Sequence, residues 1–209
     1  MKKIMTLVGA SMFLASSVLA GGMIGIKLGT GDLEATKNSY TAGSNTYAAQ
    51  TKSESEQFGA IFAEISLPQV EGLSLGVEYI PFTATVSVDG NSSDSHLELS
   101  EHTTLYGLYM KDMGDVNAFF KAGYAMADIG NVKANYATTT VNSNDSSLEG
   151  PMIGVGIQKD LDALVGRLEI TYTDYDDVSV TTTSNGSASV KKSADANLTT
   201  ISFSVAKSF

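Results

Sequence analysis

The chain has 209 residues, with 13 basic and 23 acidic side chains and no cysteine. Its net charge of −10 excludes nucleic acid as an expected partner, because phosphate binding requires a basic face. Without cysteine, the fold cannot be stabilised by the disulfides that many small exported domains use.

The first predicted element is a secretory signal peptide at residues 1–20. Lys2 and Lys3 give it a positive start, 4–14 is an apolar run, and Val18-Leu19-Ala20 offers small residues for cleavage. The run is too short for a transmembrane helix. Residues 21–209 are therefore predicted to be one mature domain, in which 11 basic residues (13 without the two lysines of the signal peptide) accompany 23 acidic ones.

Eight segments of the mature chain alternate apolar and other residues with a period of two, which predicts β-strands. No long stretch has the 3.6-residue periodicity of a helix. The apolar sets, in chain order, are Ile24, Ile26 and Leu28; Ile61, Ala63, Ile65 and Leu67; Leu73, Leu75, Val77 and Tyr79; Tyr106, Leu108 and Met110; Val116, Ala118, Phe120, Ala122 and Tyr124; Ile153, Val155 and Ile157; Leu168, Ile170 and Tyr172; and Ile201, Phe203, Val205 and Phe209.

The connections between these segments alternate strictly between short and long. The short ones are 68–72, 111–115 and 159–165, and they contain the turn residues Pro68, Gly72 and Gly114. The long ones, rich in Ser, Thr and Asn, are predicted at 32–55, 82–100, 129–150 and 174–196. Their expected tips are 42–45, 89–90, 142–145 and 185–186, where Asp-Gly and Asn-Gly are strong hairpin signals.

A soluble β-sandwich would also alternate, but a membrane barrel accounts better for this pattern. Charged residues such as Lys27, Glu78 and Lys121 lie deep within strands, opposite uninterrupted apolar faces. A transmembrane barrel has an apolar outer face, a polar lumen, short periplasmic turns and long extracellular loops. The predicted fold is thus all-β: an eight-stranded antiparallel up-and-down transmembrane β-barrel.

If the apolar set of each strand faces lipid, the alternate residues point into the lumen. Six of them are charged, three of each sign: Lys27, Glu64, Glu78, Lys121, Arg167 and Glu169. The interior of an eight-stranded barrel is only wide enough for side chains to fill, and buried charges must be paired. We therefore expect a neutral ion-pair plug near the periplasmic end, packed by Phe62 and Phe119, in a barrel that does not conduct.

The C-terminal segment "ISFSVAKSF" ends on an aromatic residue preceded by alternating apolar residues. It resembles the terminal strand of bacterial outer-membrane barrels, although Lys207 replaces a residue that is usually apolar. With "FFKAGYAMADIG" (119–130), the whole mature chain resembles the small eight-stranded barrels related to the barrel of outer membrane protein A. This resemblance implies a monomer in the outer membrane of a Gram-negative bacterium, exported through the periplasm and recognised there by the barrel assembly machinery.

Some small barrels are lipid A-modifying enzymes, and "HLELSEHTT" is the most enzyme-like segment of this chain. On a regular strand, His96, Glu98, Ser100 and His102 would share one face, with Glu101 nearby. A catalytic triad requires contact between nucleophile and base, which sequence proximity does not establish. The favoured interpretation is a polar strand extension, so we predict that the protein is not an enzyme and assign no catalytic, cofactor-binding or metal-ligating residue.

The predicted role is structural or one of surface interaction, in which the barrel stabilises the membrane and presents four acidic loops to the outside. A narrow channel for small solutes is the first alternative, and a lipid A-modifying enzyme is the second. Carboxylates can bind Ca²⁺ or Mg²⁺, but the acidic cluster Asp174, Asp176 and Asp177 lacks the glycine and the spacing of a calcium loop. We expect an acidic outer surface whose charges interact with the divalent ions around lipopolysaccharide. Its members are Asp32, Glu34, Asp89, Asp94, Asp145, Asp174, Asp176 and Asp177. Two glycosylation sequons, at 89–93 and 195–199, match a pattern that chance often produces in such loops.

Overall fold

A computed structural model describes residues 21–42, 44–81, 84–87, 96–129, 139–143, 147–184 and 190–209. The predicted signal peptide at 1–20 lies outside these residues. Among the described residues, no helix is long and apolar enough to span a bilayer.

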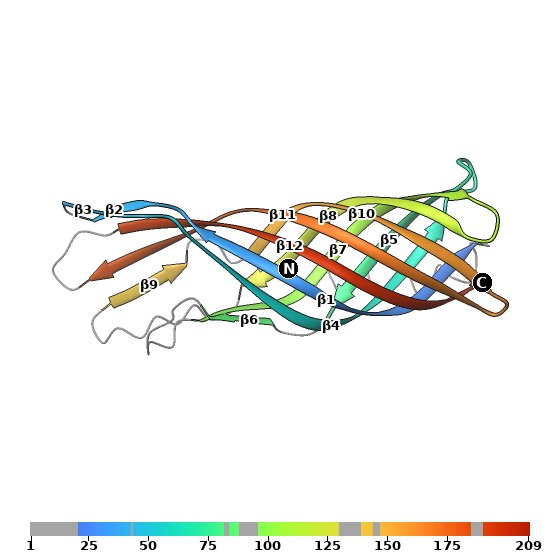
Figure 1. Cartoon of the computed structure of the whole chain (residues 1–209), viewed down its shortest axis with the longest axis horizontal. Helices are drawn as coiled ribbons and strands as arrows, with labels where there is room; N and C mark the ends of the chain where they lie inside the picture. The colour runs from blue at the N-terminus through green and yellow to red at the C-terminus, as the bar shows by residue number, and fades with distance from the viewer. Residues whose placement is uncertain are drawn as a thin grey trace.

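Eight long strands form the barrel wall, and each is antiparallel to its neighbours (Figure 1). They are β1 (Gly22–Lys37), β4 (Gln50–Ser66), β5 (Leu73–Ile80), β7 (His96–Asp112), β8 (Asn117–Ile129), β10 (Ser147–Leu161), β11 (Leu164–Ser184) and β12 (Val190–Ser208). Consecutive wall strands pair in chain order, and β12 pairs with β1 from Met23↔Ser208 to Lys37↔Ala194. This last pairing closes the sheet, so the predicted barrel is confirmed.

In the described part of the chain, four short strands lie at the end opposite the short turns. β2 (Tyr40–Ala42) and β3 (Asn45–Tyr47) form a hairpin, β6 (Ala84–Ser87) pairs with β7, and β9 (Thr139–Ser143) pairs with β11. The hairpin confirms the predicted tip at 42–45. The tip expected at 89–90 and that at 185–186 lie outside the described residues, as does part of the tip at 142–145.

Much of what the sequence predicts as long loops is strand. β1 continues to Lys37 while paired with β4, and β11 pairs with β12 as far as Thr182↔Val190. These extensions carry Ser, Thr, Asp and Lys instead of a lipid-facing apolar set, which is why period-two hydrophobicity does not reveal them. The paired strands therefore continue past their last alternating apolar residues, and Figure 1 shows them reaching the end of the molecule where β2, β3 and β9 lie.

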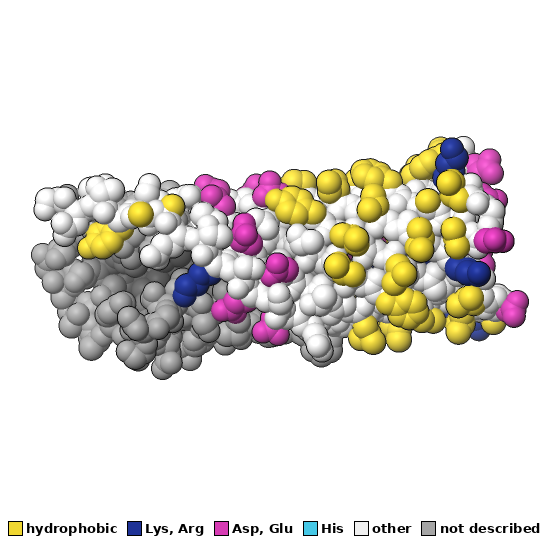
Figure 2. Space-filling model, viewed as in Figure 1, with side chains coloured by type: hydrophobic (Ala, Val, Ile, Leu, Met, Phe, Trp, Pro, Cys, Tyr) yellow, Lys and Arg dark blue, Asp and Glu magenta, His cyan; other side chains and the backbone are white. Residues whose placement is uncertain are grey.

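An exposed apolar band surrounds the half of the barrel next to the short turns (Figure 2). On β11 it runs from Leu164 to Tyr172, and nine residues of a tilted strand span roughly 20 Å along the barrel axis. The lipid-facing prediction is confirmed for seven of the eight strands. Exposed members include Ile26, Leu28, Ile61, Leu75, Phe120, Ile153, Val155, Leu168, Ile170, Ile201 and Phe203.

The lipid-facing prediction is wrong for β7. Tyr106 and Leu108 point inward and are 5 % and 0 % exposed, whereas Leu105 and Tyr109 face outward at 45 % and 52 %. Both alternating sets of this strand are apolar, so alternation alone cannot choose between them. The choice follows from packing: a Cβ at Gly76, which pairs with Tyr106, would lie 2.4 Å from the Tyr106 ring. The inward glycine makes room for that ring.

Candidate functional site

Four of the six predicted lumen charges form one closed network, which we call the ion tetrad: Lys27, Glu78, Lys121 and Glu169. Lys27 Nζ donates to Glu78 Oε2 at 2.5 Å and to Glu169 Oε1 at 2.7 Å. Lys121 Nζ donates to the same two oxygens at 2.9 and 3.1 Å. The charges come from β1, β5, β8 and β11, so the network connects strands on all sides of the barrel.

The other two charges form an arginine pair nearer the short turns. Arg167 binds Glu64 in a bidentate manner, through Nη1 at 2.6 Å and Nη2 at 2.7 Å, and its Nε donates to Gln158 Oε1 at 2.6 Å. The guanidinium lies between two rings, with Cζ 5.6 Å from the centroid of Phe62 and 5.4 Å from that of Phe119. The predicted filling by Phe62 and Phe119 is confirmed, and both rings also interact with the charge.

Tyr106 connects these two layers, and sequence analysis missed it because it assigned this side chain to lipid. Its hydroxyl donates to Glu64 Oε1 at 2.8 Å. Lys121 Nζ lies 3.9 Å from the centroid of its ring. Tyr106 therefore contacts a carboxylate of the arginine pair and a cation of the ion tetrad.

The charges balance within the lumen. The buried charged side chains of the described residues are three cations and three carboxylates, at most 7 % exposed: Lys27, Glu64, Glu78, Lys121, Arg167 and Glu169. Every one has an oppositely charged partner within 3.1 Å. Such pairing is required because an unpaired buried charge is strongly destabilising. The predicted neutral ion-pair plug is thus present in the structure.

Above the ion tetrad, on the side away from the short turns, the lumen changes character. Thr171 and Thr200 share a hydrogen bond of 2.7 Å, and His102 Nε2 lies 2.8 Å from the Tyr175 hydroxyl. Beyond them is an apolar cap. It consists of the buried Ala125, Ala127, Leu148 and Tyr175, with Leu33, Ile129, Ala196 and Leu198 packed against them.

The enzyme-like segment does not have the predicted shared face. The β7–β8 register shifts between Ser100 and Thr103, where Glu101 has φ = 53°, so three steps on β7 match two on β8. Ser100 pairs with the outward-side Asp128, whereas His102 points into the lumen toward Tyr175. A bulge therefore puts Ser100 and His102 on opposite sides of the sheet. The side chains of His96 and Glu98 lie outside the described part of the structure.

Acidic side chains gather just above the apolar band, and Figure 2 shows them between that band and the far end. We call this group the acidic collar: Asp32, Glu149, Asp174, Asp176, Asp177 and Asp195. Asp32 accepts hydrogen bonds from Ser53 at 2.7 Å and Ser55 at 3.1 Å. The predicted members Asp89, Asp94 and Asp145 fall outside the described residues, while Glu34 is exposed on β1 and accepts a bond from Asn197.

Within the acidic collar, Asp177 lies beside Asp195 at a second bulge, between Tyr175 and Val178. A hydrogen bond with Asp195 and the negative charge of that residue raise the pKa of the Asp177 carboxyl. Among the described residues, no group of three or more His, Cys, Asp or Glu is arranged to hold a metal ion. Of the two sequons, 89–93 lies outside the described residues, and 195–199 lies within β12, between β1 and β11.

No protein-family profile and no curated protein matches the sequence. Solved structures do match. Outer membrane protein AlkL, determined in DMPC bilayers, has a TM-score of 0.60 at 12 % identity, over 91 % of this chain and 92 % of that one. Neisserial surface protein A has a TM-score of 0.50 at 14 % identity, over 88 % of this chain and 97 % of that one.

The chain has the fold of a small outer-membrane β-barrel. At these identities the likeness establishes the architecture alone. The terminal strand fits the same architecture. Phe209 is 51 % exposed, and its ring covers Gly22 on the outer face, where a Cβ would lie 2.5 Å from it.

Proposed function

We propose that this protein is an integral outer-membrane barrel of a Gram-negative bacterium, with a structural or surface-interaction role and a closed lumen. The observation that supports this most directly is the combination of an exposed apolar band outside with fully paired charges inside. The band suits lipid, and the paired charges suit a lumen that is filled by side chains. The short turns are proposed to face the periplasm and the strand extensions the outside.

Planar-bilayer recording tests the closed lumen against the narrow-channel alternative. Purified protein should insert without producing steady conductance, because both charged layers join opposite walls of the barrel. The matched control is the double variant Glu78→Ala, Lys121→Ala, which removes one charge of each sign and keeps the lumen neutral. A steady conductance in the wild type, at a level similar to this variant, would mean that the charges line an open passage.

The lipid A enzyme is the weaker alternative, because the β7 bulge separates Ser100 from His102. If Ser100 were a nucleophile, lipid A from a strain expressing the protein should differ in acylation from lipid A of a Ser100→Ala strain. We expect identical lipid A profiles by mass spectrometry. A difference in lipid A acylation that depends on Ser100 would support the lipid A-modifying enzyme instead.

The C-terminal strand is proposed to carry the assembly signal. Phe209 N donates to Gly22 O at 2.9 Å, and the amides of Gly21 and Gly22 donate back to Phe209 O at 3.1 Å. Deleting Phe209 should reduce the amount of heat-modifiable protein in the outer membrane. The control is deletion of Ser44, between β2 and β3 at the other end of the barrel. Wild-type yield after loss of Phe209 would show that the machinery does not depend on this residue.

The acidic collar is proposed to meet the outer leaflet through divalent cations bound to lipopolysaccharide, since it lies where the apolar band ends. All six of its side chains are carboxylic acids, so direct contact with lipid phosphates would be repulsive. Mg²⁺ should therefore raise the thermal midpoint in lipopolysaccharide-containing vesicles more than in phosphatidylcholine vesicles. An equal effect in both would contradict the proposed contact.

A further inference from the structure

Three lysines occupy equivalent places at the short-turn end of the barrel, one on each of three strands. Lys111 is the last outward residue of β7 and Lys207 that of β12, while Lys159 on β10 is followed by one more outward residue, Leu161. All three are exposed. Two residues before each, on the same face, lies an apolar side chain of the band: Tyr109, Ile157 or Val205. We call these three lysines the lysine rim.

Because side chains alternate between the two faces of a strand, two of these lysines point away from the aspartate that follows each of them in the sequence. The dipeptide Lys-Asp occurs at 111–112 and again at 159–160, both times where a strand reaches its short turn. Since successive residues point to opposite faces, each lysine points to the lipid side and each aspartate to the lumen side. Gly114 N donates to Asp112 at 2.7 Å, and Gln158 donates to Asp160 at 3.3 Å.

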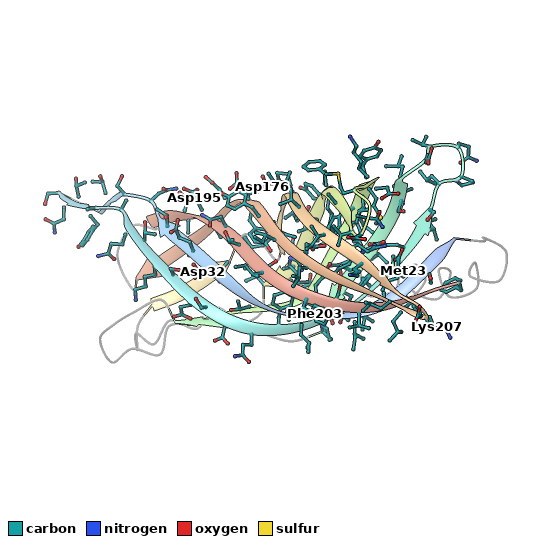
Figure 3. The ribbon with its side chains drawn as sticks, turned by 45° about the vertical axis from the view of Figure 1, so that its right-hand side comes forward. Met23, Asp32, Asp176, Asp195, Phe203 and Lys207 are labelled. Atoms are coloured by element: carbon teal, nitrogen blue, oxygen red, sulfur yellow. The ribbon has the colours of Figure 1, made fainter. Side chains whose placement is uncertain are left out.

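The lysine rim is free of internal partners. In the described part of the chain, no ion pair or side-chain hydrogen bond involves Lys111, Lys159 or Lys207. By contrast, Lys27 and Lys121, which are buried, each contact two carboxylates. Figure 3 shows Lys207 at the same end of the barrel as Met23, away from the acidic Asp32, Asp176 and Asp195.

The distances suit a lipid headgroup. Two residues along a tilted strand place each lysine Cα roughly 5 Å beyond its apolar neighbour, and an exposed apolar residue follows two positions later: Met113, Leu161 or Phe209. The lysines therefore lie in the last part of the apolar band, next to the membrane interface. A lysine stem can lie along apolar surface while its ammonium reaches the polar region. At that depth the groups that carry negative charge are the phosphates of phospholipid headgroups.

We propose that the lysine rim binds the phosphates of anionic phospholipids in the periplasmic leaflet. The proposal rests on the topology given under the proposed function, in which the short turns face the periplasm. On its outward face the barrel then presents unpaired lysines to phospholipid phosphates near one border of the apolar band and the acidic collar near the other, while Glu71, Asp115 and Asp162 lie in the short turns themselves. Each lysine near an anionic surface strengthens binding by about fivefold.

The test is the triple variant Lys111→Gln, Lys159→Gln, Lys207→Gln, refolded beside the wild type into two kinds of vesicle. One is phosphatidylcholine, and the other contains one third phosphatidylglycerol. The matched control is Lys52→Gln, Lys191→Gln, Lys192→Gln, which removes the same charge from β4 and β12 at the opposite end. The readout is the midpoint temperature at which the heat-modifiable band is lost.

Phosphatidylglycerol should raise the midpoint of the wild type and of the control by several degrees, and this gain should shrink by at least half in the triple variant. The gain in midpoint temperature of the wild type should also disappear in 0.5 M salt, because the Debye length is then on the order of 4 Å and the charges are screened. An equal gain in all three proteins, or one that survives salt, overturns the lysine rim as a lipid site. Neither result affects the proposed barrel, which would instead fail if the wild type inserted into neither vesicle.

Discussion

The two halves of the lumen are filled in different ways although they lie between the same strands. Near the short turns, six charges and three aromatic rings fill the interior. Farther along, β8 presents Ala125 and Ala127, β10 presents Leu148, and β11 presents Tyr175. The charged half needs every partner present, whereas the apolar half needs only volume. Loss of a single side-chain group should therefore lower the free energy of unfolding far more in the charged half than in the apolar half.

The largest expected effect is that of Glu78→Ala, which breaks the charged half. It leaves Lys27 and Lys121 with only Glu169 to share, and breaking a buried ion pair costs about 3–5 kcal/mol. Urea unfolding in vesicles measures the loss. Glu34→Ala is the control, since Glu34 is exposed on β1 and its one hydrogen bond is 3.3 Å long. Equal stability of the two variants would mean that the tetrad is hydrated.

The next effect should come from Leu148→Ala in the apolar cap. Leu148 is 2 % exposed, and truncating a buried leucine costs about 2–5 kcal/mol. We expect the lower end of that range, because Leu33 and Leu198 are only partly buried and can move into the space. The same unfolding assay applies, with Leu28→Ala on the lipid face as control. A loss larger than that of Glu78→Ala would reverse the comparison.

Tyr175→Phe should have a smaller effect, because it removes one hydroxyl at the border between the two halves. The variant keeps the ring in the cap and deletes the hydrogen bond to His102 Nε2, which is worth about 1 kcal/mol. A double-mutant cycle with His102→Ala measures the coupling. Additive losses would show that the bond contributes nothing of its own.

The smallest effect concerns pH and lies outside the lumen. Because Asp195 raises the pKa of Asp177, the folded protein holds that proton more tightly than the unfolded chain does. The stability from this proton is present below the ordinary aspartate pKa and is lost as pH rises through the raised one. The protection factors of amides in the β11–β12 extension, which compare each exchange rate with that of the unfolded chain at the same pH, should therefore fall over that interval, and Asp177→Asn should remove the fall. The same pH dependence in Asp177→Asn would assign it to another group.

Apart from Tyr106 and Leu108 on β7, the charged half was predictable from sequence, and the apolar half was not. In the charged half, outward residues such as Ile26, Phe120 and Ile170 are apolar and their neighbours are charged, so alternation identifies both faces. In the apolar half, the outward residues meet headgroups and water, so polar residues such as Asp174 face outward instead. There Leu33, Leu148 and Leu198 are apolar residues pointing inward, the reverse of the rule that holds in the membrane.

Two individual errors on β7 have different physical origins. On β7, Leu105 and Tyr106 are both apolar, so no contrast exists between faces, and only the neighbouring Gly76 indicates where the ring fits. The bulge after Ser100 shifts the register without leaving a glycine or proline in the sequence to mark it. Alternation predicts faces only while pairing is regular and the two environments differ.

The pairing of the last strand with the first has a consequence for how the barrel is made. Lys27 and its partner Glu169 are 142 residues apart, because Lys27 belongs to the first wall strand and Glu169 to the seventh. Before the sheet closes, the cations and carboxylates lie on an open sheet. Each charge is then hydrated, and the network of ion pairs is incomplete. Contacts of such long sequence separation form late. The plug is therefore the last part of the molecule to exist, and its completion coincides with the moment when the sheet loses its two free edges.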